Sequence, residues 1–440
     1  MENLLKQAER IFGLFLLKSK INLLTQSETR KRLFSNFLSL SFLQVANYIF
    51  PLITLPYLVR VLGPEKFGLI AFAQAFIGYF QILTDYGFNL SATREISIHR
   101  DNKEKVSEIF SSVIVIKFFL LLISLLIMSI IVFSFEKFRQ DWQIYYLTFG
   151  VVLGNVLFPV WFFQGIEKMK YITFLNILTK LIFTVAIFLF VRQASDYLYV
   201  PLLNSIGFVV AGVLSLQIVF RGFGVKLYFP KLESLKHQLR EGWYIFISTV
   251  AISLYTISNT FILGLFTNNT IVGYYSAAEK IIRAVQSLLG PISQTVYPYI
   301  SKGAVESKEK ALNFIRKLVY IIGSGSLFLS LLIFIFATQI VNIILGSQYQ
   351  QSIVVLRILA FLPFIIGLSN IFGIQTMLNF NFEKAFSNIL IFAGIINITL
   401  AFIFVPLFKH IGISISVLIT EIFITVVMFI YLKLKGVKII

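Results

Sequence analysis

The sequence of 440 residues contains no cysteine, and only 13% of its residues are charged. Without cysteine the chain cannot form a disulfide scaffold, a thiolate zinc site, an iron–sulfur cluster or a cysteine nucleophile. Soluble domains contain about 25% charged residues, so the low charge excludes an ordinary soluble globular protein. Walker A, GxGxxG and paired-carboxylate motifs are also missing, which argues against an ATP-driven pump. Three histidines, His99, His237 and His410, lie in separate predicted loops, so we expect no metal site and no cofactor.

Apolar residues dominate the chain instead. They make up 58% of it, with 48 phenylalanines and a mean hydropathy of +0.86. A membrane-spanning helix needs about 20 mostly apolar residues, and twelve stretches meet this requirement. They are 36–58, 67–90, 110–134, 143–165, 171–191, 198–220, 243–266, 272–300, 318–345, 352–378, 385–408 and 411–432. The sequence therefore predicts an all-α polytopic membrane protein with twelve transmembrane helices.

The basic residues indicate how these spans are oriented. The chain has 38 Lys and Arg against 20 Asp and Glu. Of the basic residues, 27 fall in the two termini and the even-to-odd loops, whereas 6 fall in the other set of loops. Because cytoplasmic loops collect Lys and Arg, this asymmetry predicts that both termini are cytoplasmic. The same asymmetry explains most of the formal charge of +18, so this charge does not indicate a nucleic-acid partner.

Two pairs of segments indicate an internal repeat. Residues 67–73, FGLIAFA, resemble residues 272–278, VGYYSAA, and residues 164–168, QGIEK, resemble residues 380–384, FNFEK. Both pairs relate one span to the span six places later, which predicts two halves of the same orientation. Transporters with such paired halves bind substrate between them near the membrane midplane.

The repeat and the hydropathy together suggest the organisation of the chain. We expect an amphipathic interfacial segment over 1–35, a first lobe of six helices over 36–220, a cytoplasmic linker over 221–242, and a second lobe with a short tail over 243–440. A loosely ordered tail explains residues 1–35 equally well.

Several charged residues fall inside or beside the predicted spans, where an ionised group is costly and often marks a transport pathway. The basic ones, candidates for a cationic substrate cavity, are Lys117, Lys180, Lys280, Arg283 and Arg357. Candidates for gating or ion coupling are Arg60, Asp85, Arg94, Glu279 and Glu421. A structural role is an open alternative for about half of the eight that lie inside spans. Glu279 and Arg283 are four residues apart on one helix face, and Asp85 could pair with Arg94 or with a basic residue of the N-terminal segment.

The first spans also carry a family pattern. The run PLITLPYLVRVLGPEKFG at 51–68 is followed by DYGFN at 85–89 and ATREI at 92–96, and later by WFFQG at 161–165 and AEK at 278–280. These residues resemble the Wzx/RfbX polysaccharide flippase family, and the resemblance extends over about residues 36–432.

The resemblance implies the fold of the multidrug/oligosaccharidyl-lipid/polysaccharide (MOP) exporter superfamily. In this fold, two lobes of six helices form a V around a central cavity with alternating access. The implied substrate is an undecaprenyl-pyrophosphate-linked oligosaccharide, moved to the outer leaflet of the bacterial inner membrane for O-antigen, capsule or exopolysaccharide synthesis. Membrane lipids, a polysaccharide polymerase and a chain-length regulator are the implied partners.

Three alternatives compete with this interpretation. A multidrug antiporter of the same fold would favour an acidic cavity, whereas the charged residues in these spans are mostly basic. A lipid II flippase would usually have fourteen spans. A membrane enzyme such as a polymerase or ligase would need long external loops with catalytic groups, and the predicted external loops are short. The sequence thus favours a transporter over an enzyme.

Overall fold

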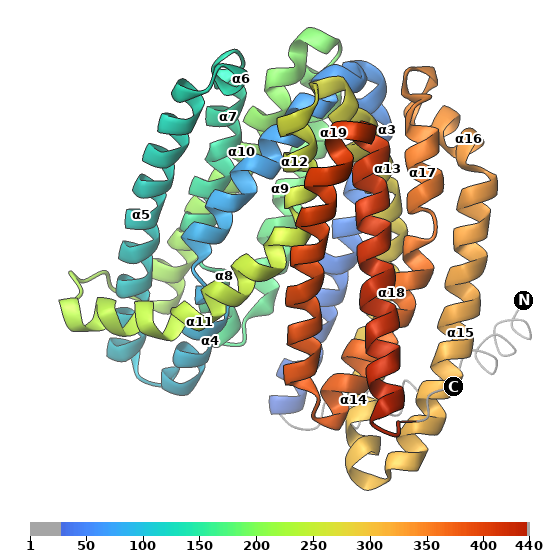
Figure 1. The fold of residues 1–440 in the computed structure, drawn as a ribbon. Coiled ribbons are helices and arrows are strands. Elements are labelled where there is room, and N and C mark those ends of the chain that lie inside the picture. Colours follow the sequence, from blue (N-terminus) through green and yellow to red (C-terminus); the bar gives the residue numbers. More distant parts are fainter. Residues whose placement is uncertain (1–27, 438–440) are drawn as a thin grey trace, which may run out of the picture.

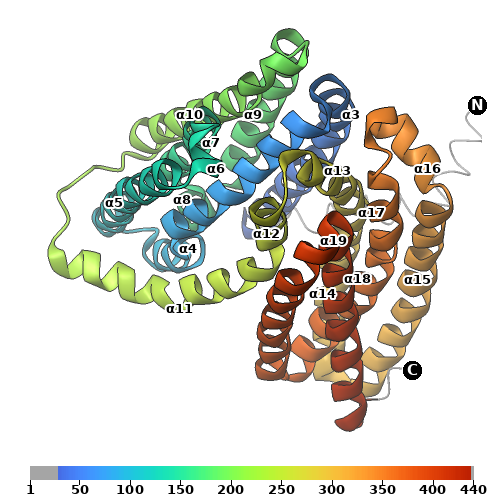
Figure 2. The same ribbon diagram turned by 45° about the horizontal axis from the view of Figure 1, so that its top comes forward.

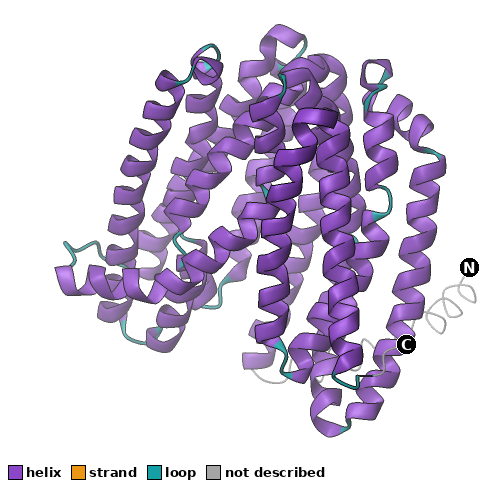
Figure 3. Ribbon diagram, in the orientation of Figure 1, coloured by secondary structure: helices purple, strands orange, loops and turns teal. Residues whose placement is uncertain are grey.

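The computed structural model describes residues 28–437. Residues 1–27 of the expected interfacial segment 1–35 lie outside the described residues, and residues 28–35 form the beginning of helix α3. In the described part the chain is helical and contains no strands (Figure 3). The helices of the first half are α3 (Glu28–Asp85), α4 (Phe88–His99), α5 (Lys103–Ser134), α6 (Glu136–Arg139), α7 (Trp142–Leu157), α8 (Val160–Gly165), α9 (Met169–Phe190), η1 (Ala194–Leu198), α10 (Tyr199–Gln217) and η2 (Ile218–Gly222).

The second half continues the same architecture. Its helices are α11 (Leu232–Thr256), α12 (Ser258–Phe266), α13 (Asn269–Gln286), α14 (Leu289–Glu306), α15 (Lys308–Ile335), α16 (Ala337–Ile340), η3 (Val341–Leu345), η4 (Ser347–Tyr349), α17 (Ser352–Leu359), α18 (Leu362–Asn370), η5 (Ile371–Met377), η6 (Leu378–Phe380) and α19 (Glu383–Leu434).

Eight helical segments of the described chain are long and apolar enough to cross a membrane. The first of them, Phe42–His99, covers most of α3 together with α4, and the last, Glu383–Leu434, is α19. Helices α3 and α19 have non-helical backbone at Gly63 (φ 69°) and Lys409 (φ 52°). Figure 1 shows that each folds back there into two antiparallel helices, so each contains two of the expected spans. Ten of the twelve expected spans are accounted for in this way.

The other two expected spans, 243–266 and 272–300, fall on helices α11 to α14. These helices do not meet the length and apolarity criterion. The chain is broken at Ile257, between α11 and α12, and α13 carries Glu279, Lys280 and Arg283. Segment 243–266 contains no charged residue but is divided at Ile257 into two helices, of which α12 has only 9 residues. In segment 272–300 the charges on α13 lower the mean hydropathy.

The helices gather into two groups. Helices α3 to α10 form an N-terminal group and α12 to α19 a C-terminal group, and Figure 2 shows α11 passing from one to the other. One buried apolar cluster, which includes Phe88, Phe110 and Trp161, belongs to the first group, and another, which includes Ile315 and Met428, belongs to the second. The largest cluster joins the two groups through α3 and α13. The second part of the expected linker 221–242 is helical, because α11 already begins at Leu232.

The backbones of the two groups meet at a pair of glycines. A Cβ atom placed on Gly68 of α3 would lie 1.8 Å from the carbonyl oxygen of Asn269, and one placed on Gly273 of α13 would lie 1.9 Å from the carbonyl oxygen of Pro64. The backbones therefore touch, which only glycine permits at both positions. Gly68 and Gly273 are equivalent residues of the sequence repeat, as are Pro64 and Asn269. The contact is reciprocal, as a pseudo-two-fold relationship between the halves requires.

Candidate functional site

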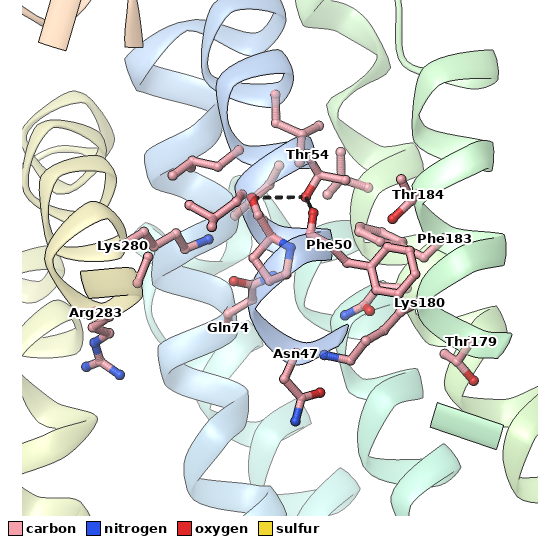
Figure 4. A pocket seen from close by; sticks show the side chains of 18 of the residues that line it. Asn47, Phe50, Thr54, Gln74, Thr179, Lys180, Phe183, Thr184, Lys280 and Arg283 are labelled. Atoms are coloured by element: carbon pink, nitrogen blue, oxygen red, sulfur yellow. Dashed lines mark hydrogen bonds between the residues drawn. The ribbon is translucent and has the colours of Figure 1, made fainter. Parts of the chain in front are cut away.

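A central cavity of about 480 Å³ lies between the two helix groups. Its walls come from α3, α9 and α10 on one side and from α13 on the other (Figure 4). The charged residues that line it are Lys180, Lys280 and Arg283, and no Asp or Glu occurs among the described residues of the lining. The cavity therefore combines apolar walls with a positive charge.

Helical periodicity explains why these side chains share the cavity. On α9, Asn176, Lys180 and Thr184 follow each other at intervals of four residues and so lie on one helix face. On α13, Lys280 and Ala284 have the same spacing. In Figure 4 the ammonium groups of Lys180 and Lys280 extend into the cavity from opposite walls.

Lys280 also contacts an aromatic ring in the opposite wall. Its Nζ atom lies 4.8 Å from the centroid of the Phe67 ring of α3, within the range of a cation–π interaction. This contact directs the ammonium group toward the first helix group. An anion in the cavity would thus meet cations from both groups.

Uncharged polar side chains complete the lining. Asn47, Gln74, Asn176 and Asn204 contribute amide groups, and Thr54 contributes a hydroxyl that also donates to the carbonyl oxygen of Phe50 at 3.0 Å. Amides can donate to and accept from sugar hydroxyls. The sequence had no motif for Asn47, Gln74 and Asn176, although each is a polar residue within an apolar span.

A second, C-terminal cavity of about 240 Å³ lies inside the C-terminal group. Its polar lining residues are Asn259, Tyr275, Glu279, Arg283, Gln286 and Glu421. Arg283 and Glu279 form an ion pair of 2.8 Å across one turn of α13, as the spacing suggested. Among the described lining residues, Arg283 is the one that the two cavities share.

The structure places the remaining candidates outside the central cavity. Lys117 on α5 forms a 2.9 Å ion pair with Asp85 at the end of α3, so Asp85 pairs with Lys117 and not with Arg94. Arg94 is exposed on α4. Arg357 is exposed and donates to the hydroxyl of Thr338 at 3.3 Å.

Arg60 has a contact between the two groups. It lies near the Gly63 turn of α3, and its guanidinium donates to the carbonyl oxygen of Ile343 in η3. Lys137 of α6 likewise donates to the carbonyl oxygen of Thr267 at 2.6 Å. Both contacts tie the N-terminal group to the C-terminal group.

A helical membrane bundle of two pseudo-symmetric groups around a central cavity is the fold of a MOP-type transporter. Solved structures share this fold. An inward-facing multidrug resistance MATE family transporter is similar with a TM-score of 0.66 and 16% identity, over 92% of this chain and 99% of that chain. The inward closed form of the lipid II flippase MurJ is similar with a TM-score of 0.65 and 15% identity, over 92% of this chain and 89% of that chain.

The family follows from the sequence matches. The model of the polysaccharide biosynthesis protein family matches residues 33–304. A protein assigned as an O-antigen transporter in Escherichia coli (strain K12) is 38% identical over 90% of this chain and 96% of its own. A second protein assigned as an O-antigen transporter, from Shigella dysenteriae, is 30% identical over 92% of this chain and 99% of its own. The chain therefore belongs to the polysaccharide biosynthesis protein family of the MOP superfamily, as the resemblance predicted.

Proposed function

We propose that the chain is a flippase for surface-polysaccharide synthesis and not an enzyme. Its substrate would be an undecaprenyl-pyrophosphate-linked oligosaccharide, moved from the cytoplasmic to the outer leaflet of the inner membrane. The observation that carries this proposal is the central cavity with Lys180, Lys280 and Arg283 and no acidic residue in its described lining. A cavity of this charge favours a pyrophosphate and disfavours the organic cations that a multidrug antiporter would bind.

The cavity provides what each part of the substrate needs. The three basic side chains would bind the pyrophosphate through charge-assisted hydrogen bonds. The amides of Asn47, Asn176 and their neighbours would replace the water that the sugar hydroxyls lose, because unpaired hydroxyls are costly outside water. The lipid tail would remain in the surrounding bilayer.

Transport would require the two helix groups to move relative to each other. In this proposal residues 36–220 and 243–440 act as two lobes that rock about their contact, joined by 221–242, with both termini in the cytoplasm. A pyrophosphate moving outward across an inside-negative membrane gains about 2.3 kcal/mol per charge for each 100 mV. A polymerase and a chain-length regulator would act on the product after it reaches the outer leaflet.

A deletion strain tests the proposal. We would measure surface polysaccharide together with the cytoplasm-facing undecaprenyl-pyrophosphate oligosaccharide, and restore the gene on a plasmid as the control. The expected result is loss of the polymer and accumulation of the inward-facing intermediate. Normal polymer without accumulation, in a strain with no second flippase, would contradict the proposal.

A further inference from the structure

Arg283 joins two cavities of opposite character. On one side it lines the central cavity together with Lys180 and Lys280, where the charged lining is basic. On the other side it lines the C-terminal cavity, where the two acidic residues are Glu279 and Glu421. The guanidinium in the structure is paired with Glu279 at 2.8 Å. An anion in the central cavity would compete with that carboxylate for the same cation.

The two carboxylates differ in their partners. Glu279 accepts from Arg283 and also from the hydroxyl of Tyr275 at 3.3 Å. Glu421 extends into the cavity from α19, and among the described side chains none donates a hydrogen bond or forms an ion pair with its carboxylate. The charged and titratable groups of the cavity are therefore Tyr275, Glu279 and Arg283 from α13 and Glu421 from α19, while α17 and α18 contribute Leu359, Leu362 and Ile366.

We propose that the C-terminal cavity is a proton-binding site, with Glu421 as the proton acceptor, and that it takes up its proton when Arg283 turns to an anion in the central cavity. With Arg283 paired to Glu279, the guanidinium compensates part of the negative charge. If Arg283 contacts the anion instead, the two carboxylates of one small cavity lose their cation. Like charges in such a site disfavour the second ionised form, so Glu421 takes a proton from the medium.

The chemistry of the cavity favours a proton over a metal cation. A sodium ion would need several oxygen ligands converging at short distance. A proton needs a single carboxylate oxygen and leaves a neutral group behind. The proton would accompany the anion as a compensating charge, and the complex would keep a net negative charge on which the membrane potential acts.

The inference rests on the proposed function, because the competing anion is the pyrophosphate of its substrate. Binding and protonation are linked reciprocally. An anion that binds with proton uptake therefore binds more tightly as the pH falls, beyond any change due to the anion itself. Removing the acceptor should abolish that extra dependence.

The test uses the purified full-length chain in nanodiscs, with undecaprenyl pyrophosphate as the probe. Proton uptake on binding is recorded with a pH-sensitive dye in weak buffer between about pH 5 and about pH 9, a range in which protein carboxyl groups titrate. The wild type should take up more protons per bound probe than Glu421→Gln, with a maximum difference approaching one proton. The probe's own titration cancels in this comparison. Equal proton numbers in the two proteins would overturn the proposal.

Two further variants keep the test decisive if Glu421→Gln does not fold. Arg283→Gln should weaken binding about tenfold and lose the extra proton uptake, whereas Lys180→Gln should weaken binding similarly and keep it. If both weaken binding with unchanged proton uptake, the proton site is wrong and the flippase site stands. If neither weakens binding, the substrate site itself is wrong. Replacing sodium with choline should change nothing, and a sodium requirement would contradict the choice of a proton.

Discussion

The ammonium group of Lys117 lies 2.9 Å from a carboxylate oxygen of Asp85, in a pair where the lysine side chain is only 2% exposed and the aspartate 36%. The pair joins α5 to the end of α3 and so connects two helices of the N-terminal group. A buried lysine without a counter-ion is strongly unfavourable. The residue is thus a structural cation, in contrast to the three that line the central cavity.

Breaking this pair should destabilise the protein. We expect Asp85→Ala to lower the free energy of unfolding by about 2 kcal/mol, less than the 3–5 kcal/mol of a fully buried pair, because Asp85 retains contact with solvent. The double variant Asp85→Ala with Lys117→Met should recover part of the loss. Thermal unfolding in detergent measures both. Glu65→Gln, which breaks the exposed Glu65–Lys66 pair, is the control and should have little effect.

Neutralising the cavity should impair binding of the headgroup. A charge-assisted hydrogen bond contributes about 1.5–3 kcal/mol, so Lys180→Gln or Lys280→Gln should each weaken binding of undecaprenyl pyrophosphate by about tenfold or more. The control is Arg357→Gln, which removes a basic residue of a membrane helix outside the cavity. A loss of affinity in Arg357→Gln equal to that in Lys180→Gln would contradict the assignment of the site.

The glycine contact should control access to the cavity. Gly68→Ala places a methyl group 1.8 Å from a backbone carbonyl oxygen, so the two helix groups must separate there. The contact lies near the Gly63 turn, at the end of the bundle that we propose to be external. A cysteine introduced at Ser287, a lining residue of the central cavity, should therefore react faster with an impermeant maleimide added outside.

The control for this change is an alanine elsewhere in a membrane helix. A Cβ atom placed on Gly325 of α15 would meet no described atom within 4 Å, so Gly325→Ala should leave the labelling rate unchanged. Because the natural chain contains no cysteine, the introduced thiol is the single reactive site. Unchanged labelling in Gly68→Ala would show that this contact does not close the cavity.

Helix α11 should be held against the N-terminal group by Glu95. This residue of α4 accepts from the side chain of Gln238 and lies 2.5 Å from the ring nitrogen Nε2 of His237. Glu95→Ala removes both contacts, and we expect clearly faster backbone hydrogen exchange in residues 232–240. The control is Glu104→Ala, which replaces an exposed residue of α5 and should not change the rate of hydrogen exchange in residues 232–240.

Much of the fold was predictable because membrane insertion depends on local composition. Runs of about 20 apolar residues identify spans without knowledge of their neighbours, and ten of the twelve expected spans are evident by this criterion. The exceptions lie on α11 to α14, where the helix breaks at Ile257 in one segment and charges such as Lys280 reduce the apolar signal of α13 in the other.

The candidate site was less predictable, because the direction of a side chain depends on how its helix packs. Burial in a span suggested five basic residues, and three of them line the central cavity. Lys117 faces Asp85 instead, a pairing between helices that sequence distance does not reveal. The spacing of Asn176, Lys180 and Thr184 on one helix face was a usable signal, since polar residues recurring every four positions mark a face turned away from lipid.

The reciprocal contact of Gly68 with Asn269 and of Gly273 with Pro64 has the form of an interface between two identical subunits. In a two-fold homodimer, residue i meets residue j while residue j of the first copy meets residue i of the second. Two unfused copies of one half would meet through this same contact before any linker joined them. Expressing residues 1–222 and 223–440 as separate chains should therefore support export through assembly at the glycine pair, with the covalent link replaced by the self-complementary surface that each half contributes.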